Sequence, residues 1–116
     1  DLPQIPESVS INLYRIAQEA LTNVAKHAPG ARVELNLAPA RSRGAGDALS
    51  LEIVDDGPGF ESGAVRSGLG LSTIRERAEA MGGVATIASG VGEGVRISVF
   101  VPIRMVGQAD AVGRGA

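Results

Sequence analysis

The stretch Gln18–Ala28, QEALTNVAKHA, belongs to a helical pattern that begins near Ser8 and decides the fold. Apolar residues recur in it every three or four positions, as on the core-facing side of an amphipathic helix. A polar strip runs beside them, because Glu19, Asn23 and Lys26 follow at spacings of four and three. That strip is either a solvated surface or the wall of a cleft. The predicted core face consists of Leu13, Ile16, Ala17, Ala20, Leu21, Val24 and Ala28.

The composition indicates one small globular domain, with 116 residues of which 44% are hydrophobic and 21% charged. A net charge of −2 without a basic block argues against nucleic acid as a partner. With no cysteine and one histidine, disulfides and thiolate or histidine-cluster metal sites are excluded. No apolar run approaches the roughly 20 residues of a membrane span, and no signal peptide is visible.

The helix over about 8–28 should end at Pro29-Gly30, with Ser8 or Ser10 as its N-terminal cap. Alternating apolar residues predict an antiparallel strand pair over 31–37 and 48–54. The polar stretch 39–47 is predicted to form the loop between them, and 60–67 is predicted to form a short flexible lid. The residues expected to face inward from the two strands are Val33, Leu35, Leu37, Leu49, Leu51 and Ile53.

A second helix is predicted over 71–81, ended by Gly82-Gly83, with strands over 84–88 and 95–101 after it. These elements sum to an α+β two-layer sandwich, with helices on one face of a mixed, mainly antiparallel sheet. We expect 1–104 to form the domain and 105–116 a disordered tail. Because the chain opens abruptly with DLPQIPE, we expect its first strand or a sensor or partner segment to have been left out.

Three glycine-rich segments could carry chemistry. Asp55–Gly59 (DDGPG) ends a strand, where a carboxylate followed by Gly-x-Gly suits a planar donor such as an adenine amino group. Gly68–Leu71 (GLGL) precedes a helix whose N–H groups favour an anion such as phosphate. Gly90–Gly94 (GVGEG) either closes a hairpin or walls a pocket. Singly, each also fits an ordinary turn or linker, and neither a P-loop nor a dinucleotide fingerprint is present.

The order of these motifs is more specific than any of them alone. LYRIAQEALTNVAKHA, VDDGPGF and GLGLSTIRERAEAMGG resemble the ATP-binding (catalytic) domain of bacterial two-component sensor histidine kinases, most closely the NarL/DesK type. That domain belongs to the GHKL superfamily with DNA gyrase B, Hsp90 and MutL, whose architecture is the Bergerat fold. The resemblance covers about 8–102, nearly the whole chain.

The resemblance implies ATP and Mg²⁺ as cofactors and gives roles to the polar strip. Asn23 matches the residue that coordinates Mg²⁺ bridging the ATP phosphates. Glu19 matches the catalytic acid, which acts as general base or orients the attacking imidazole. Lys26 would reach the phosphates, and His27 either helps it or packs with one satisfied hydrogen bond.

The glycine-rich segments match the remaining nucleotide contacts of the family. Asp55 would bind adenine, with Asp56 exposed beside it. Where the family usually has Thr, this chain has Val95, so a hydroxyl contact to adenine is missing. Arg75, Glu76 and Arg77 are expected to form surface pairs. The remaining matched residues are Gly57 and Gly59 beside the base, Gly68, Leu69, Gly70 and Leu71 at the phosphates, and Gly92 and Gly94 of the third glycine box.

The implied function is transfer of the γ-phosphoryl group of ATP to a histidine on a separate dimerisation domain. The implied partners are that domain and, in the full protein, a cognate response regulator. The resemblance implies a cytoplasmic domain without direct membrane contact, in a parent whose membrane anchoring stays open. Three alternatives also stay open: an anti-sigma-factor serine kinase, a non-enzymatic ATP-gated dimerisation clamp, and a degenerate interaction domain.

Overall fold

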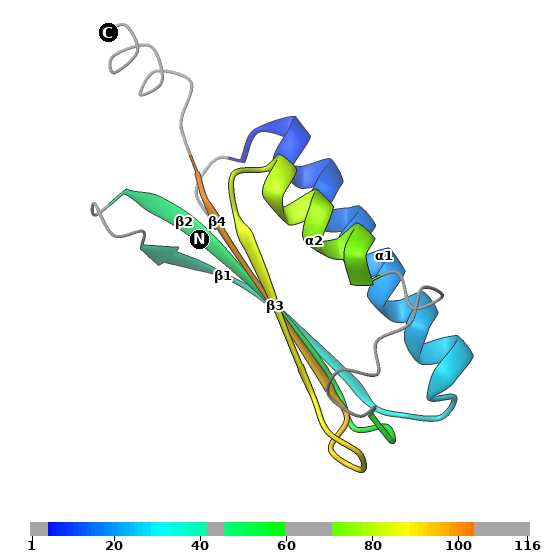
Figure 1. The fold of residues 1–116 in the computed structure, drawn as a ribbon. Helices are drawn as coiled ribbons and strands as arrows, with labels where there is room; N and C mark the ends of the chain where they lie inside the picture. The colour runs from blue at the N-terminus through cyan, green and yellow to red at the C-terminus, as the bar shows by residue number, and fades with distance from the viewer. Residues whose placement is uncertain (1–4, 42–45, 60–70, 104–116) are drawn as a thin grey trace, which may run out of the picture.

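The computed structural model describes residues 5–41, 46–59 and 71–103. Figure 1 shows both helices on one face of a twisted, four-stranded sheet, so the predicted α+β two-layer architecture is confirmed. The predicted lid over 60–67, Gly68–Gly70 and the tail over 105–116 lie outside the described residues. The elements are α1 (Glu7–His27), β1 (Val33–Arg41), β2 (Asp47–Asp55), α2 (Leu71–Ala80), β3 (Val84–Ser89) and β4 (Val95–Pro102).

The sheet has the strand order β1-β2-β4-β3. All the pairings among these described strands are antiparallel, and Leu51 of β2 lies between Leu37 of β1 and Val99 of β4. Helix α1 lies mainly over β2, and α2 lies over β3 and β4. The buried residues of the four described strands lie on the two middle strands, β2 and β4.

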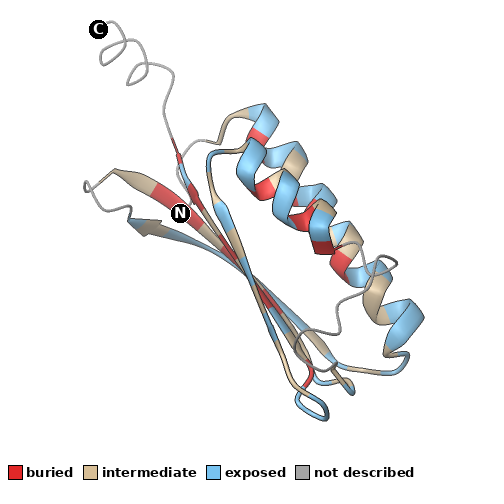
Figure 2. Ribbon diagram, viewed as in Figure 1, coloured by how far each residue is buried: buried red, intermediate tan, exposed pale blue. Residues whose placement is uncertain are grey.

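The core lies between the helix layer and these two middle strands (Figure 2). Alternate residues of β2 and β4 face the helices, which is why the period-two pattern of both strands was readable from the sequence. Helix α1 contributes its apolar stripe at helical spacing, and α2 adds a shorter one. The buried residues of the cluster are Val9, Leu13, Ile16, Ala20, Leu49, Leu51, Ile53, Leu71, Ile74, Ala78, Ile97, Val99, Val101 and Ile103.

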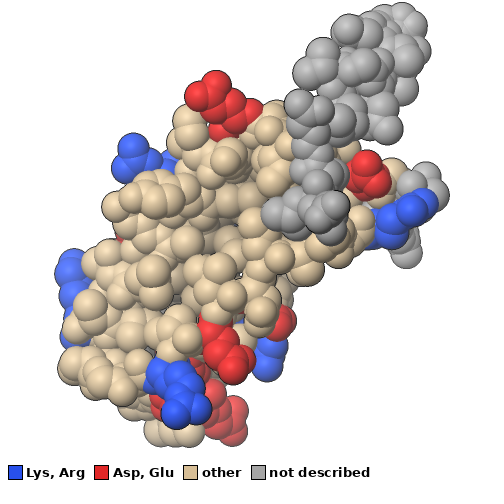
Figure 3. Space-filling view, turned by 180° about the vertical axis from the view of Figure 1, so that it is seen from behind, with Lys and Arg blue, Asp and Glu red and all other residues tan. Residues whose placement is uncertain are grey.

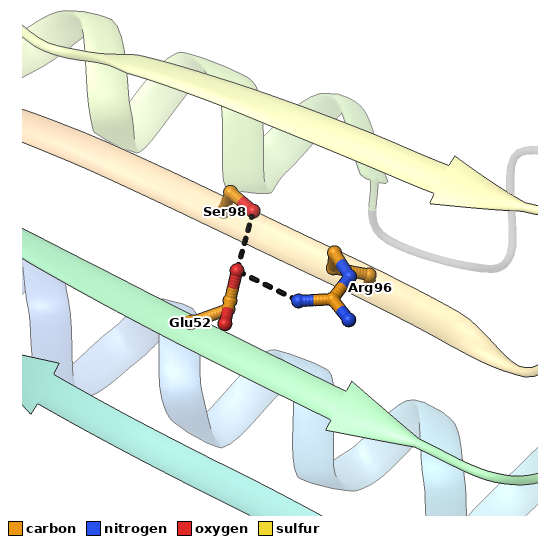
Figure 4. A network of polar contacts seen from close by, with 3 residues as sticks. All are labelled: Glu52, Arg96 and Ser98. Atoms are coloured by element: carbon orange, nitrogen blue, oxygen red, sulfur yellow. Dashed lines mark hydrogen bonds and ion pairs between the residues drawn. The ribbon is translucent and has the colours of Figure 1, made fainter.

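The opposite face of the sheet carries polar side chains. Oε2 of Glu52 on β2 forms an ion pair with Nη1 of Arg96 at 2.8 Å and accepts a hydrogen bond from Oγ of Ser98 at 3.4 Å. Both partners lie on β4 (Figure 4). In Figure 4 the helices lie behind the strands, so this network is on the face away from them. Such exposed cross-strand pairs contribute little stability each, but they favour one register over a slipped one.

The start of α1 differs from the prediction. The helix begins at Glu7, Pro6 occupies the N-cap position, and no side chain of the described residues caps it, so the expected capping role of Ser8 or Ser10 is wrong. The backbone N–H groups of Val9 and Ser10 both donate to the carbonyl oxygen of Pro6. Glu7 adds a carboxylate in the first turn, where the helix dipole favours negative charge.

Two of the three predicted inward residues of β1, Leu35 and Leu37, are exposed instead of buried, whereas Val33 is half-buried and packs against the core. Leu35 and Leu37 pair with the buried Ile53 and Leu51, so they do lie on the helix side of the sheet. They are nevertheless 44% and 38% exposed, because β1 is an edge strand whose main contacts are with β2. Leu21 of α1, expected in the core, is 45% exposed, since it lies about 100° round the helix from buried Ala20.

The loop between β1 and β2 is shorter than predicted. Strand β1 continues through Pro39 to Arg41, and β2 begins at Asp47, so residues 39–41 and 47 of the predicted loop belong to strands. Proline has no N–H for the ladder, but an edge strand tolerates it because one of its sides needs no partner.

Glycines end the second helix as predicted. Gly82 has φ +78°, and the N–H of Gly83 donates to the carbonyl oxygen of Ala78 at 2.8 Å, which is a Schellman arrangement. Neither helix described in this fold is long and apolar enough to cross a membrane.

Candidate functional site

A pocket lies where the C-terminal half of α1 meets the ends of β2 and β4. Its wall is mostly apolar, with a few polar groups among the aliphatic ones, which is the usual composition of a small-molecule site. Because α1 and α2 run in opposite directions, the pocket also receives the first residue of α2. The described residues that line it are Ala20, Asn23, Val24, His27, Ala28, Ile53, Asp55, Pro58, Gly59, Leu71, Val95 and Ile97.

Helix α1 brings two predicted polar residues to this pocket. Asn23 and His27 are four residues apart, hence on one side of the helix, and both line the pocket. Asn23 is half-buried with its Oδ1 atom buried, whereas His27 is exposed. Glu19, one turn before Asn23, is half-buried, and Lys26 is exposed; neither is among the described lining residues.

The end of β2 places two adjacent acids in different surroundings. Asp55 lines the pocket, and its Oδ1 accepts a hydrogen bond from the backbone N–H of Gly57 at 2.9 Å. Asp56 is exposed, as predicted, and its Oδ1 accepts from the N–H of Arg32 at 2.8 Å. The N–H of Asp56 donates back to the carbonyl oxygen of Arg32 at 3.1 Å. Asp56 therefore ties the turn to the start of β1.

The predicted glycines of this region allow segments of the chain to approach one another closely. A Cβ atom on Gly57 would lie 2.6 Å from the Cβ of Ala28 at the end of α1. Gly59 has φ +67° and Gly94 has φ +72°, and a Cβ atom on either would collide with a backbone carbonyl oxygen. Gly59 and Val95 line the pocket, whereas Gly57, Gly92 and Gly94 are not among its lining residues.

Sequence reasoning missed much of the apolar wall. The sequence predicts Ala20, Val24 and Ala28 in the core; Ala20 is buried there, and the stripe continues past it through half-buried Val24 and Ala28 into the pocket. Ile53 and Ile97 are cross-strand partners, so they form neighbouring parts of the wall. The available signal was the stripe itself, which extends two turns beyond its last fully buried residue.

Comparison with known families decides what kind of domain this is. A model described as "Histidine kinase-, DNA gyrase B-, and HSP90-like ATPase" matches residues 8–105. The chain belongs to this family. The resemblance stated from the motifs is thereby confirmed, and the domain is an ATP-binding domain of the histidine-kinase type.

Individual relatives agree with the family. The chain is 40% identical over 100 residues to the sensor histidine kinase LiaS of Bacillus subtilis, covering 85% of the chain and 26% of LiaS. It is 39% identical over 106 residues to the histidine-protein kinase/phosphatase UhpB of Salmonella typhimurium, covering 91% of the chain and 20% of UhpB. The chain therefore spans about a quarter or less of the length of these relatives.

A solved structure has the same fold. The histidine kinase domain of a blue-light-activated kinase from Erythrobacter litoralis superposes with a TM-score of 0.67 at 21% identity. The match covers 89% of this chain and 52% of that one. At this level of identity the likeness concerns the fold alone.

Proposed function

We propose that this domain binds ATP with Mg²⁺ and donates the γ-phosphoryl group to a histidine on a separate dimerisation domain of a two-component sensor kinase. One observation carries the proposal: Asn23, Asp55 and Leu71, from three different elements, meet in a single pocket. The family is one of ATPases, and the relatives that match most of this chain are named sensor histidine kinases. These names favour a histidine acceptor over the serine of an anti-sigma-factor kinase.

Adenine would lie in the apolar part of the pocket, with Asp55 as its polar anchor. Oδ1 of Asp55 already accepts from Gly57, and no described residue donates to Oδ2. A lone carboxylate oxygen suits the exocyclic amino group of adenine and repels the oxo group of guanine. Val24, Ile53 and Ile97 would contact the flat faces of the base, and Val95 would add one more aliphatic contact.

The triphosphate would extend toward α2. Leu71 begins this helix, whose N-terminal N–H groups favour an anion. In this proposal Gly68, Leu69 and Gly70 complete that phosphate site, with Lys26 and His27 approaching from α1. The new bond would form between the acceptor imidazole nitrogen and the γ-phosphorus, while the bond from the γ-phosphorus to ADP breaks. Positioning and charge neutralisation supply most of the rate.

Magnesium fits Asn23 by its chemistry. The amide oxygen of Asn23 is a buried hard donor in the pocket wall, and Mg²⁺ prefers oxygen ligands. No three His, Cys, Asp or Glu residues gather into a metal site within 5–41, 46–59 and 71–103. Phosphate oxygens and water would therefore complete the coordination, and the ion would offset phosphate charge. Glu19, one turn from Asn23, would accept the proton of the attacking imidazole or orient it.

Calorimetric titration with ATP, with and without Mg²⁺, tests the binding half of the proposal. We expect the wild-type chain to bind ATP and to bind it more tightly with Mg²⁺. Asn23→Ala should remove most of the Mg²⁺ dependence, because the ion loses its protein ligand, while binding without Mg²⁺ changes little. The absence of ATP binding by the folded wild-type chain would refute the proposed function.

Transfer is tested with [γ-³²P]ATP and a purified histidine-bearing dimerisation segment from a related kinase. We expect label on the segment and none on His27, which lies in the wall of the nucleotide pocket. Glu19→Gln should slow transfer more than it weakens ATP binding, since the proton is handled only during the reaction. Acid-stable label on serine would instead indicate the serine-kinase alternative, and nucleotide-driven dimerisation without transfer the clamp.

A further inference from the structure

The hairpin turn between β3 and β4 lies directly against the turn that follows Asp55. The backbone N–H of Gly92 donates to the carbonyl oxygen of Pro58 at 2.6 Å, across a separation of more than thirty residues. Pro58 and Gly59 line the pocket, so this hydrogen bond joins the hairpin to the pocket wall itself. On the other side of the same turn, Asp56 is joined to Arg32.

Because glycines stand at the contact, the backbones of the hairpin and of the turn can approach each other directly. A Cβ atom on Gly59 would collide with the carbonyl oxygen of Gly90 and lie 2.8 Å from that of Gly94. A Cβ atom on Gly94 would collide with the carbonyl oxygen of Asp55. Because both glycines also have positive φ, no other residue type fits either position without strain. The hairpin therefore contacts both ends of the turn, at Asp55 and at Gly59.

Ser89 adds a side chain to this contact. Its Oγ donates to the carbonyl oxygen of Gly94 at 2.7 Å and lies 2.9 Å from the place of a Cβ atom on Gly59. Ser89 is the last residue of β3, and Gly94 directly precedes β4, so the bond closes the base of the hairpin. A closed hairpin keeps Gly92 and Gly94 in reach of Pro58 and Asp55.

We propose that this hairpin, 89–94, is a clasp that fixes the orientation of the Asp55 carboxylate, with Ser89 as a positioning residue for base selectivity. The inference rests on the proposed function, since it assumes that Asp55 anchors adenine. The carboxylate is oriented by the N–H of Gly57, and the hairpin fixes the next two residues of that turn. If the turn is loosened, the Asp55 carboxylate loses its fixed orientation. The preference for the amino group of adenine over the oxo group of guanine then falls more than the affinity contributed by apolar and phosphate contacts.

The test compares ATP and GTP affinities, both with Mg²⁺, for the wild type, Ser89→Ala and Ser89→Thr. We expect Ser89→Ala to lower the preference for ATP over GTP by three- to tenfold. The affinity for Mg²⁺-tripolyphosphate, which has no base, should stay unchanged. Ser89→Thr should restore the preference, because it keeps the hydroxyl. A merely structural role would lower the melting temperature and leave the ATP-to-GTP ratio intact, and that result would overturn the clasp.

Gly94→Ala and Gly82→Ala form a matched pair. Both positions have positive φ, +72° and +78°, but a Cβ atom on Gly82 would meet nothing within 4 Å. The two variants thus share backbone strain, and only Gly94→Ala pushes the hairpin away from Asp55. We expect the ATP preference to fall in Gly94→Ala and to persist in Gly82→Ala. An equal ratio in both would contradict the clasp.

The amide of Gly92 gives an independent measurement. It is an exposed residue at a hairpin tip, where exchange with solvent is ordinarily fast. The hydrogen bond to Pro58 predicts slow exchange in the wild type and faster exchange in Ser89→Ala. If the wild type binds no ATP, the proposed function fails. If it binds ATP, but Ser89→Ala changes neither the preference for ATP over GTP nor the exchange rate of the Gly92 amide, the clasp alone fails.

Discussion

Single residues in the turn after β2 have separate tasks, as Asp55 and Asp56 show. Asp55 lines the pocket and keeps one carboxylate oxygen without a described donor, whereas Asp56 is exposed and binds the backbone of Arg32. The motif DDGPG contains both acids, and the resemblance had assigned adenine to the first of them. The contacts explain the difference, because the side chains of consecutive residues at a strand end leave on opposite sides.

Asp55→Asn should raise the dissociation constant for ATP about 10- to 100-fold. The substitution replaces an oxygen acceptor by an amide in a charge-assisted hydrogen bond, which contributes about 1.5–3 kcal/mol. Asp56→Asn is the control, since the amide oxygen can still accept from Arg32 and the residue is not in the pocket wall. Titration of both variants checks this. Equal affinities in Asp55→Asn and wild type would remove Asp55 from the site.

At the level of elements, the two helices are joined by a polar contact as well as by the core. Arg77 of α2 is half-buried, and its Nη1 donates to Oδ1 of Asn12 at 3.2 Å, while Asn12 Nδ2 donates to the carbonyl oxygen of Ser8 at 3.0 Å. The sequence had suggested only surface pairs for Arg75 and Arg77. The actual partner of Arg77 could not be predicted, because it lies 65 residues away on the other helix.

Arg77→Ala should lower the free energy of unfolding by about 1 kcal/mol, the usual contribution of one partly buried hydrogen bond. Arg75→Ala is the matched control, because Arg75 is an exposed arginine on the same helix. Urea denaturation measures both. Asn12→Ala alone and combined with Arg77→Ala completes a double-mutant cycle, and a coupling near zero would show that the contact does not stabilise the packing of α1 against α2.

Local patterns explain which elements could be predicted. The apolar periods of α1 and α2 and the alternation of β2 and β4 predicted both helices and the antiparallel sheet, since these patterns depend on neighbouring residues. The exposure of Leu35 and Leu37 depends instead on how far the helix layer extends across the sheet. The loop was predicted to start at Pro39 for a related reason. A strand with a neighbour on one side only, such as β1, can accommodate a proline. Such facts arise from long-range packing, which no local pattern contains.

On the scale of the whole molecule, the helix layer leaves part of the sheet uncovered. β1 is coloured as exposed along nearly its full length in Figure 2, although Leu35 and Leu37 face the helix side. Tyr14 and Leu21 of α1 are 63% and 45% exposed as well. Seen from behind, charged side chains lie mainly around a broad uncharged middle (Figure 3). An edge strand with exposed apolar side chains is a site where a protein readily associates with another chain.

We therefore expect the 116-residue chain to self-associate at high concentration through β1, and the double substitution Leu35→Thr, Leu37→Thr to reduce this. Threonine keeps the strand propensity while removing apolar surface. Val84→Thr on β3, the other edge strand, is the control, since Val84 is 56% exposed but is a single apolar side chain. Sedimentation velocity measures the association, and ATP titration should give wild-type affinity, because neither leucine lines the pocket. If Val84→Thr lowers the self-association as much as the double substitution does, β1 is not the surface responsible.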